Sequence, residues 1–184
     1  MRWLFTLEEN YHCPLKYYLD PASLSRLRQE VQSTIDFVDD GRHCPQVLAR
    51  ITPGGELIIL AGYSWDGNSP KINILDLFWL GTPDGVRDVK TDKPITYHAS
   101  LVHDVLGQFK NDPKMPSLFR SNPVDFWFSP GKLGRDILYL NMLRSKKFVL
   151  SWVYFLAVSL LGPLSNVYVM LAKGVRLRRG GKVA

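Results

Sequence analysis

The C-terminal quarter of the chain lacks acidic residues. Asp136 is the last carboxylate, and residues 137–184 contain Lys and Arg but no Asp or Glu, which gives this part a net charge of +8. Residues 1–136 hold 15 basic and 17 acidic residues, a net charge of −2. This asymmetry indicates an anionic partner, a membrane surface or nucleic acid, unless the basic part only aids solubility. Nucleic acid is the weaker candidate, because no aromatic platform accompanies the basic cluster at 176–182.

Other features are also scarce. The N-terminal MRWLFTLEEN has no apolar core of a cleavable signal peptide, so we expect a protein that is cytoplasmic or peripheral to a membrane. No segment is repeated, which argues against a solenoid. The two cysteines lie in the contexts YHCP (Cys13) and RHCP (Cys44). Two His-Cys pairs could hold zinc, but adjacent ligands are unusual, so one disulfide or two free thiols is the favoured interpretation.

Hydrophobic periodicity predicts the helices and strands. A helix over 21–38 begins at Pro21 and ends at Asp39-Asp40-Gly41. The glycine turn TPGG between 47–51 and 56–65 predicts a β-hairpin.

The second half of the chain is predicted to be mainly helical. Residues 72–80 fit a short helix or strand, and residues 110–131 fit a long surface loop. Helices are expected over 95–109 and 131–145, packed antiparallel. The apolar stripe of the later helix is Leu133, Ile137, Leu140 and Leu143.

An uncharged run of 25 residues, 148–172, follows Lys146-Lys147. Its length permits a single transmembrane span. However, Gly162-Pro163 interrupts it after 14 residues, and a proline ends or kinks a helix. A core or membrane-surface helix is therefore favoured, with a span within 148–172 as the alternative.

The stretch YHASLVHDVL (97–106) places His103 and Asp104 side by side in an otherwise apolar helix. A buried carboxylate is costly unless it is paired or binds a cation. Neighbouring helical residues point about 100° apart, so these two side chains cannot share one face. We therefore expect each to have its own partner: Asp136 for His103, and a cation or the loop at Asp66 for Asp104.

The order of four motifs resembles an uncharacterised phage- and prophage-associated family, domain of unknown function 1353. That family shows a Gly-aromatic-x-(Thr/Trp)-Asp-Gly-x-Ser-x-Pro loop, an Ala-x-x-x-His-Asp helix, a second helix with one Asp and an apolar helix ending in Ala-Val-x-x-x-Gly. The resemblance covers about residues 47–168 and implies a phage-type protein. The matching residues are Gly62, Tyr63, Asp66, Gly67, Ser69, Pro70, Ala99, His103, Asp104, Asp136, Ala157, Val158 and Gly162.

The His-Asp pair is also similar to the core of secreted phospholipase A2. That likeness implies that His103 is a catalytic base oriented by Asp136, and that Asp104 is a calcium ligand. Asp66 would be a second metal ligand, with calcium or zinc as the cofactor. The remaining predicted binding residues are Trp65, Gly67, Asn68, Ser69 and His98.

Two functions follow from these residues. One is a His/Asp-based hydrolase of lipid or cell-envelope material, either with or without a metal ion, with a pocket where the His-Asp residues converge. The other is a non-catalytic phage structural or accessory protein that contacts other phage proteins, in which the His103–Asp136 bond only ties two helices together.

The expected fold is α+β: a small antiparallel hairpin or sheet packed on three or four helices, with an apolar C-terminal helix. We expect an N-terminal helical extension over 1–46, a His-Asp core domain over 47–172 and a basic tail over 173–184.

Overall fold

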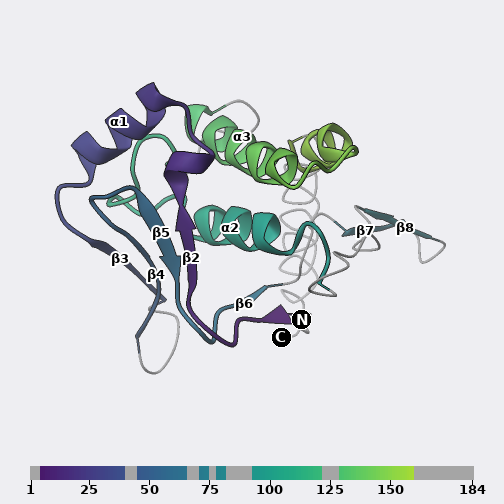
Figure 1. Ribbon diagram of the computed structural model, residues 1–184. Helices are drawn as coiled ribbons and strands as arrows, with labels where there is room; N and C mark the ends of the chain where they lie inside the picture. Colours follow the sequence, from purple (N-terminus) through teal and green to yellow (C-terminus); the bar gives the residue numbers. More distant parts are fainter. Residues whose placement is uncertain are drawn as a thin grey trace, which may run out of the picture.

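The hairpin predicted from the TPGG turn forms the centre of the main sheet. Strands β4 (Gln46–Ile51) and β5 (Glu56–Ile59) pair antiparallel, with Ile51 opposite Leu57. Gly55 occupies the turn with a positive φ of 78°, which glycine adopts without steric cost. This computed structural model describes residues 5–39, 45–65, 71–74, 78–81, 93–121 and 129–159 (Figure 1).

The N-terminal residues supply both outer strands of this sheet. Strand β2 (Tyr11–Pro14) pairs with β5, and β3 (Ile35–Asp39) pairs with β4, which gives the antiparallel order β2-β5-β4-β3. The segment predicted as an N-terminal helical extension is therefore part of the sheet and its core. Two shorter antiparallel pairs are β1 (Phe5–Thr6) with β6 (Ser64–Trp65), and β7 (Lys71–Ile74) with β8 (Phe78–Gly81).

The first helix is shorter than its sequence pattern predicts. Helix α1 covers Pro21–Glu30, with the Asp20 carboxylate accepting hydrogen bonds from the first-turn amides. The predicted extension to residue 38 is wrong, because Ile35–Asp39 is strand β3. Its β-branched and aromatic residues suit a strand, and pairing with β4 provides the backbone partners that a longer helix would have supplied internally.

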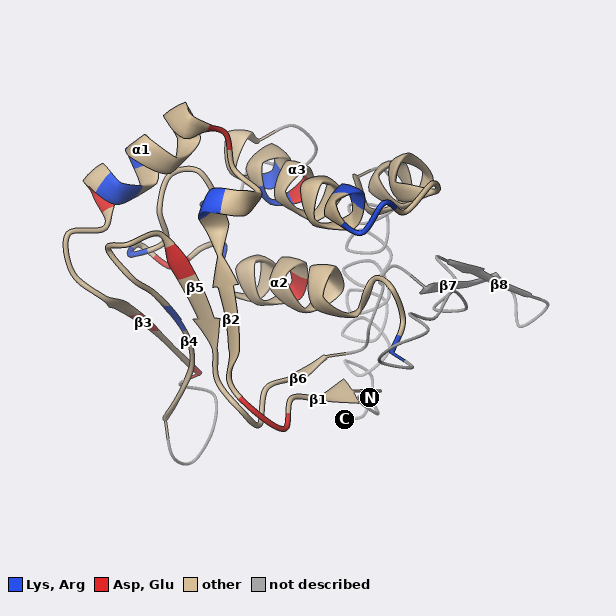
Figure 2. Ribbon diagram, viewed as in Figure 1, with Lys and Arg blue, Asp and Glu red and all other residues tan. Residues whose placement is uncertain are grey.

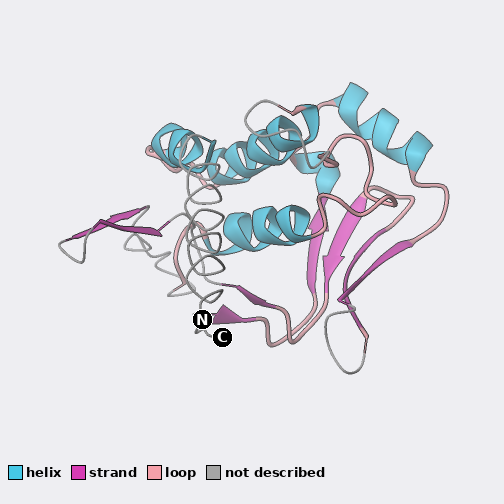
Figure 3. Cartoon of the chain, turned by 180° about the vertical axis from the view of Figure 1, so that it is seen from behind, coloured by secondary structure: helices cyan, strands magenta, loops and turns pink. Residues whose placement is uncertain are grey.

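Two long helices cover one side of the sheet (Figures 1 and 3). Helix α2 covers Tyr97–Gln108 and α3 covers Pro130–Ser145, close to the predicted bounds. They are antiparallel as predicted: Ser121, which bonds to Lys110 after α2, also contacts Ser129 before α3. At the sheet, Phe109 packs on Phe37 with ring centroids 5.3 Å apart.

The buried face of α3 differs from the predicted stripe. Leu133 and Ile137 are 52% and 40% exposed, whereas Leu140 and Leu143 are buried. The buried face includes the charged residues Arg135 and Asp136. Hydrogen-bond partners on neighbouring segments offset the free-energy cost of burying these charged side chains. The apolar residues alone therefore predicted a buried face of α3 that is rotated by part of a turn from the observed one.

The described part of the predicted surface loop, residues 110–121, forms no helix or strand but is anchored to the core. Phe119 and Met115 are buried, and the Ser117 amide donates to the Glu30 carboxylate at 2.6 Å. The guanidinium of Arg135 donates to the carbonyl of Phe119 and, at 3.1 Å, to the hydroxyl of Ser121. This segment therefore packs along the start of α3 as part of the core.

A further helical segment, 151–159, follows α3 after a basic turn. Ser151, Tyr154 and Val158 face inward at helical spacing, and the Phe148 ring packs on Tyr154 with centroids 5.1 Å apart. Within the described residues, none of the helices has the length and apolar character needed to cross a membrane. The rest of the apolar run and the 173–184 tail lie outside the described residues. The architecture is α+β, as predicted.

Candidate functional site

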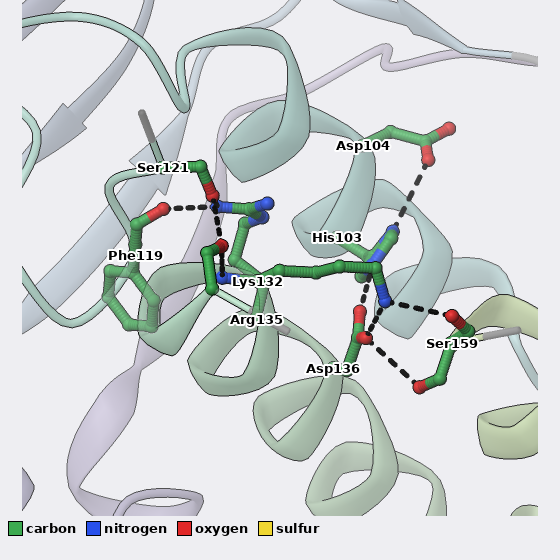
Figure 4. Close-up of polar contacts among 9 residues, drawn as sticks. His103, Asp104, Phe119, Ser121, Lys132, Arg135, Asp136 and Ser159 are labelled. Carbon is green, nitrogen blue, oxygen red and sulfur yellow. Dashed lines mark hydrogen bonds and ion pairs between the residues drawn. The ribbon is translucent and has the colours of Figure 1, made fainter. Parts of the chain in front are cut away.

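His103 and Asp136 meet between the two long helices. The Nε2 atom of His103 on α2 lies 3.0 Å from the Oδ1 atom of Asp136 on α3 (Figure 4). The Tyr139 ring, one turn further along α3, packs edge-on against the imidazole with centroids 5.5 Å apart. The predicted pairing of this histidine with this carboxylate is thus formed, and the aromatic contact restrains the orientation of the ring.

The other carboxylate oxygen of Asp136 has two partners. The Lys132 ammonium, four residues earlier on α3, forms an ion pair with Oδ2, and the Ser159 hydroxyl donates to Oδ2 at 3.0 Å. Lys132 also donates to the backbone carbonyl of Ser159 at 3.0 Å. Asp136 therefore joins α2, α3 and segment 151–159, and its side chain is only 3% exposed.

These contacts shift both pKa values. Burial alone would raise the pKa of Asp136, but the hydrogen bond and charge of His103, together with Lys132, hold it below its usual value. Burial likewise lowers the pKa of His103, yet hydrogen bonds to Asp104 and Asp136 and their negative charges outweigh it and raise that pKa. The pair therefore favours imidazolium facing carboxylate.

The second ring nitrogen of His103 points away from Asp136. Its Nδ1 atom lies 3.8 Å from Oδ1 of Asp104, and both side chains are 22% exposed. One nitrogen thus faces a buried carboxylate, and the opposite nitrogen faces a carboxylate that is partly exposed. In the neutral form of His103, with the proton on Nε2 facing Asp136, Nδ1 is the nitrogen that can accept a proton.

The predicted metal site includes residues whose positions the structure does not describe. Asp66, Gly67, Asn68 and Ser69 lie outside the described residues, so the loop expected to complete the site is not placed. Among the residues that are described, no cluster of three or more His, Cys, Asp or Glu could hold a metal ion. Calcium or zinc at Asp104 therefore stays a prediction.

The cysteine motif does not form a zinc site at its first pair. The exposed His12 and the buried Cys13 are adjacent on β2, so they project to opposite faces of the strand, and His12 pairs with Glu56. Cys13 is a free thiol, which removes the disulfide alternative. Burial, followed by the charge of Glu56, raises its pKa to about 12. Cys44 lies outside the described residues.

Two predicted binding residues have structural contacts instead. Trp65 is 1% exposed and donates from its indole nitrogen to the Ser100 hydroxyl at 3.3 Å. This burial corrects its prediction as a binding residue. His98 stacks flat on Tyr11, with ring centroids 4.4 Å apart. Burial, then the charges of Lys146 and Lys93, lower the pKa of His98 to about 4.

Sequence reasoning missed three members of the polar network. Lys132 could have been found, since it precedes Asp136 by one helical turn and such i,i+4 pairs contact each other. Ser159 carries no comparable signal, because it is one of several serines in an apolar run. Arg135 is 5% exposed, and burial lowers its pKa to about 10. Its anchoring role depends on the Phe119 carbonyl and the Ser121 hydroxyl, which lie in the segment after α2.

A cavity of about 660 Å³ lies elsewhere, between the start of β3 and the segment after α2. Its lining includes Glu30, Asp36, Lys114 and Arg120, and none of the described His-Asp residues. The pocket expected around His103 thus stays a prediction.

Comparisons of the chain with family models, with curated proteins and with solved structures each find no match.

Proposed function

We propose that this protein is a hydrolase in which His103 is the general base and Asp136 is the positioning carboxylate. The observation that carries the proposal is the orientation of the imidazole. Its Nε2 atom is held 3.0 Å from a buried carboxylate, and its Nδ1 atom faces the partly exposed Asp104 carboxylate at 3.8 Å. A histidine oriented by a carboxylate in this way is the recurring arrangement for general-base catalysis.

The proposed reaction is the attack of water on an ester or amide carbonyl. His103 accepts a proton at Nδ1 as the water oxygen bonds to the carbonyl carbon. The bond to the leaving group then breaks, and the imidazolium returns its proton to the departing oxygen or nitrogen. Asp136 stabilises the imidazolium formed in the first step. No step of this proposal passes through a metal ion.

The proposed substrate class is lipid or cell-envelope material. The resemblance to a phage-associated family motivates it, because some phage proteins act on the host envelope. The apolar and basic C-terminal quarter supports a substrate at an interface.

The experiment measures hydrolysis of phospholipid vesicles and of purified peptidoglycan by the parent and by His103→Asn. The assays are repeated with calcium, with zinc and with a chelator. We expect activity in the parent and a loss of about a hundredfold or more in the variant. His12→Asn is the control, because His12 is exposed on β2, and it should retain the parent activity. Equal activity in His103→Asn and the parent would contradict the proposal.

A non-catalytic phage structural or accessory protein is the second candidate. The observation that favours it is the engagement of both Asp136 oxygens, by His103, Lys132 and Ser159. Such a network can fix the arrangement of helices without any chemistry. No activity in the parent under any of these conditions, combined with marked destabilisation by Asp136→Asn, would favour this candidate over the hydrolase.

A further inference from the structure

Large apolar side chains gather at the start of the segment that follows α3. Among them Val149, in the turn before helical segment 151–159, is 91% exposed, and Val153, within that segment, is 58% exposed. We name this cluster the apolar ridge, and its members are Val149, Leu150, Trp152, Val153 and Leu156. Contiguous exposed apolar residues mark a site of protein or membrane interaction.

The ridge is held in place by the opposite face of the same helical segment. Tyr154 and Val158 are buried, and the Tyr154 ring packs on Phe148. Ser159, at the end of the described segment, donates to the buried Asp136 carboxylate at 3.0 Å. The packed residues therefore hold the ridge in position, and the exposure of its apolar side chains does not result from a detached segment.

Positive charge borders the ridge on its N-terminal side. Arg144 at the end of α3 and Lys146 and Lys147 in the turn after it are exposed. Figure 2 shows blue at the end of α3 and in this turn. The Arg144 guanidinium lies 6.0 Å from the centre of the Trp152 ring, so charge and aromatic surface are contiguous. The sequence has no acidic residue from 137 onward to neutralise this turn.

We propose that the apolar ridge and its basic turn form a docking surface for an anionic phospholipid bilayer. Apolar side chains beside Lys and Arg, with a Trp at their junction, are the composition of an interfacial helix that enters the headgroup region. The negative surface potential of anionic lipid complements the three positive charges. A second copy of the chain fits less well, because residues 144–156 of that copy hold three cations and no acidic residue to complement them. This proposal does not depend on whether His103 is catalytic.

The experiment is co-sedimentation of the full chain with vesicles of phosphatidylcholine and phosphatidylglycerol in equal amounts, and with vesicles of phosphatidylcholine alone. We expect binding to the anionic vesicles that weakens with added salt. Leu156→Glu should weaken it by about tenfold or more, because it places a carboxylate where an apolar side chain enters the lipid. Lys146→Gln should weaken it about fivefold on anionic vesicles and leave neutral vesicles unaffected.

Leu133→Glu is the matched control for Leu156→Glu. Leu133 has the same side chain and nearly the same exposure, 52% against 51%, but lies near the start of α3 away from the basic turn. Binding by Leu133→Glu at the parent level, with loss in Leu156→Glu, supports the ridge. Equal binding by both variants would mean that the basic cluster at 176–182 or another surface binds the lipid, and it would overturn the proposal. Concentration-dependent dimerisation that Leu156→Glu abolishes would assign the ridge to a second copy and overturn it as well.

Discussion

The backbone carbonyl of Leu118 packs directly on Gly134 of α3. A Cβ atom at Gly134 would overlap this carbonyl oxygen, and one at Gly131 would overlap the carbonyl of Arg120. Glycine at these positions therefore allows the segment after α2 to lie against the helix. The cost is two residues of low helix propensity in the first half of α3.

Gly134→Ala should destabilise the protein by about 2 kcal/mol or more, because backbone atoms cannot yield as a flexible side chain would. Gly107→Ala is the matched control: it lies in α2, and no atom is within 4 Å of the added Cβ. That control should stabilise the protein by about 0.5–1 kcal/mol through helix propensity. Denaturant titration measures both changes, and a stabilising Gly134→Ala would disprove the close packing.

The pKa of His103 should lie above its unfolded value of about 6.5 in an NMR titration of the ring protons. Removing the negative charge in Asp136→Asn should lower that pKa, since the hydrogen bond and the charge of Asp136 both raise it. Asp36→Asn, a carboxylate paired with Arg50 on the sheet, is the control and should leave the titration unchanged. An unaltered His103 pKa in Asp136→Asn would contradict the contact.

This raised pKa also has a consequence for stability. The protonated imidazole contributes its full stabilisation below the unfolded pKa of about 6.5, and this contribution is lost as the pH rises through the folded pKa. A base-catalysed rate would show the opposite trend, because only neutral His103 accepts a proton. If the proposed function is right, activity should therefore increase with pH over the same range in which the pair loses stability.

His98 should make the protein less stable in mild acid. Its pKa is lowered to about 4, so the unfolded chain binds a proton more readily than the folded one between about pH 6.5 and 4. Stability from this residue is thus present above pH 6.5 and decreases as the pH falls. The measurement compares the free energy of unfolding of the parent and His98→Phe, which keeps a ring against Tyr11 but cannot titrate. A difference between the two that is independent of pH would contradict the lowered pKa.

Cys13 should resist thiol reagents in the native state. It is fully buried, and its pKa of about 12 leaves almost no thiolate at neutral pH. In a Cys44→Ser background, we expect labelling by a disulfide reagent only after denaturant unfolds the sheet. Rapid labelling without denaturant would mean that β2 separates readily from β5.

Part of the fold was predictable because its signals are local. The Gly54-Gly55 turn predicted the β4–β5 hairpin, and the apolar period predicted α2 and α3 to within a few residues. From the antiparallel packing of those helices, the contact between His103 and Asp136 also followed. The end of α1 was not predictable in this way, because residues 31–38 continue its apolar spacing and become strand β3 only by pairing with β4.

By itself, the sequence determined the α+β class, the two central helices, the pairing of His103 with Asp136 and the gathering of positive charge after residue 136. These depend on periodicity, turn chemistry and composition, which act over a few neighbouring residues. Only the tertiary structure decided that Trp65 is a core residue, that Ser159 completes the Asp136 network, and that the apolar ridge faces outward. Each of these features depends on contacts between segments that are far apart in the sequence. Such contacts determine whether a given side chain is buried or exposed, and no local pattern reports them.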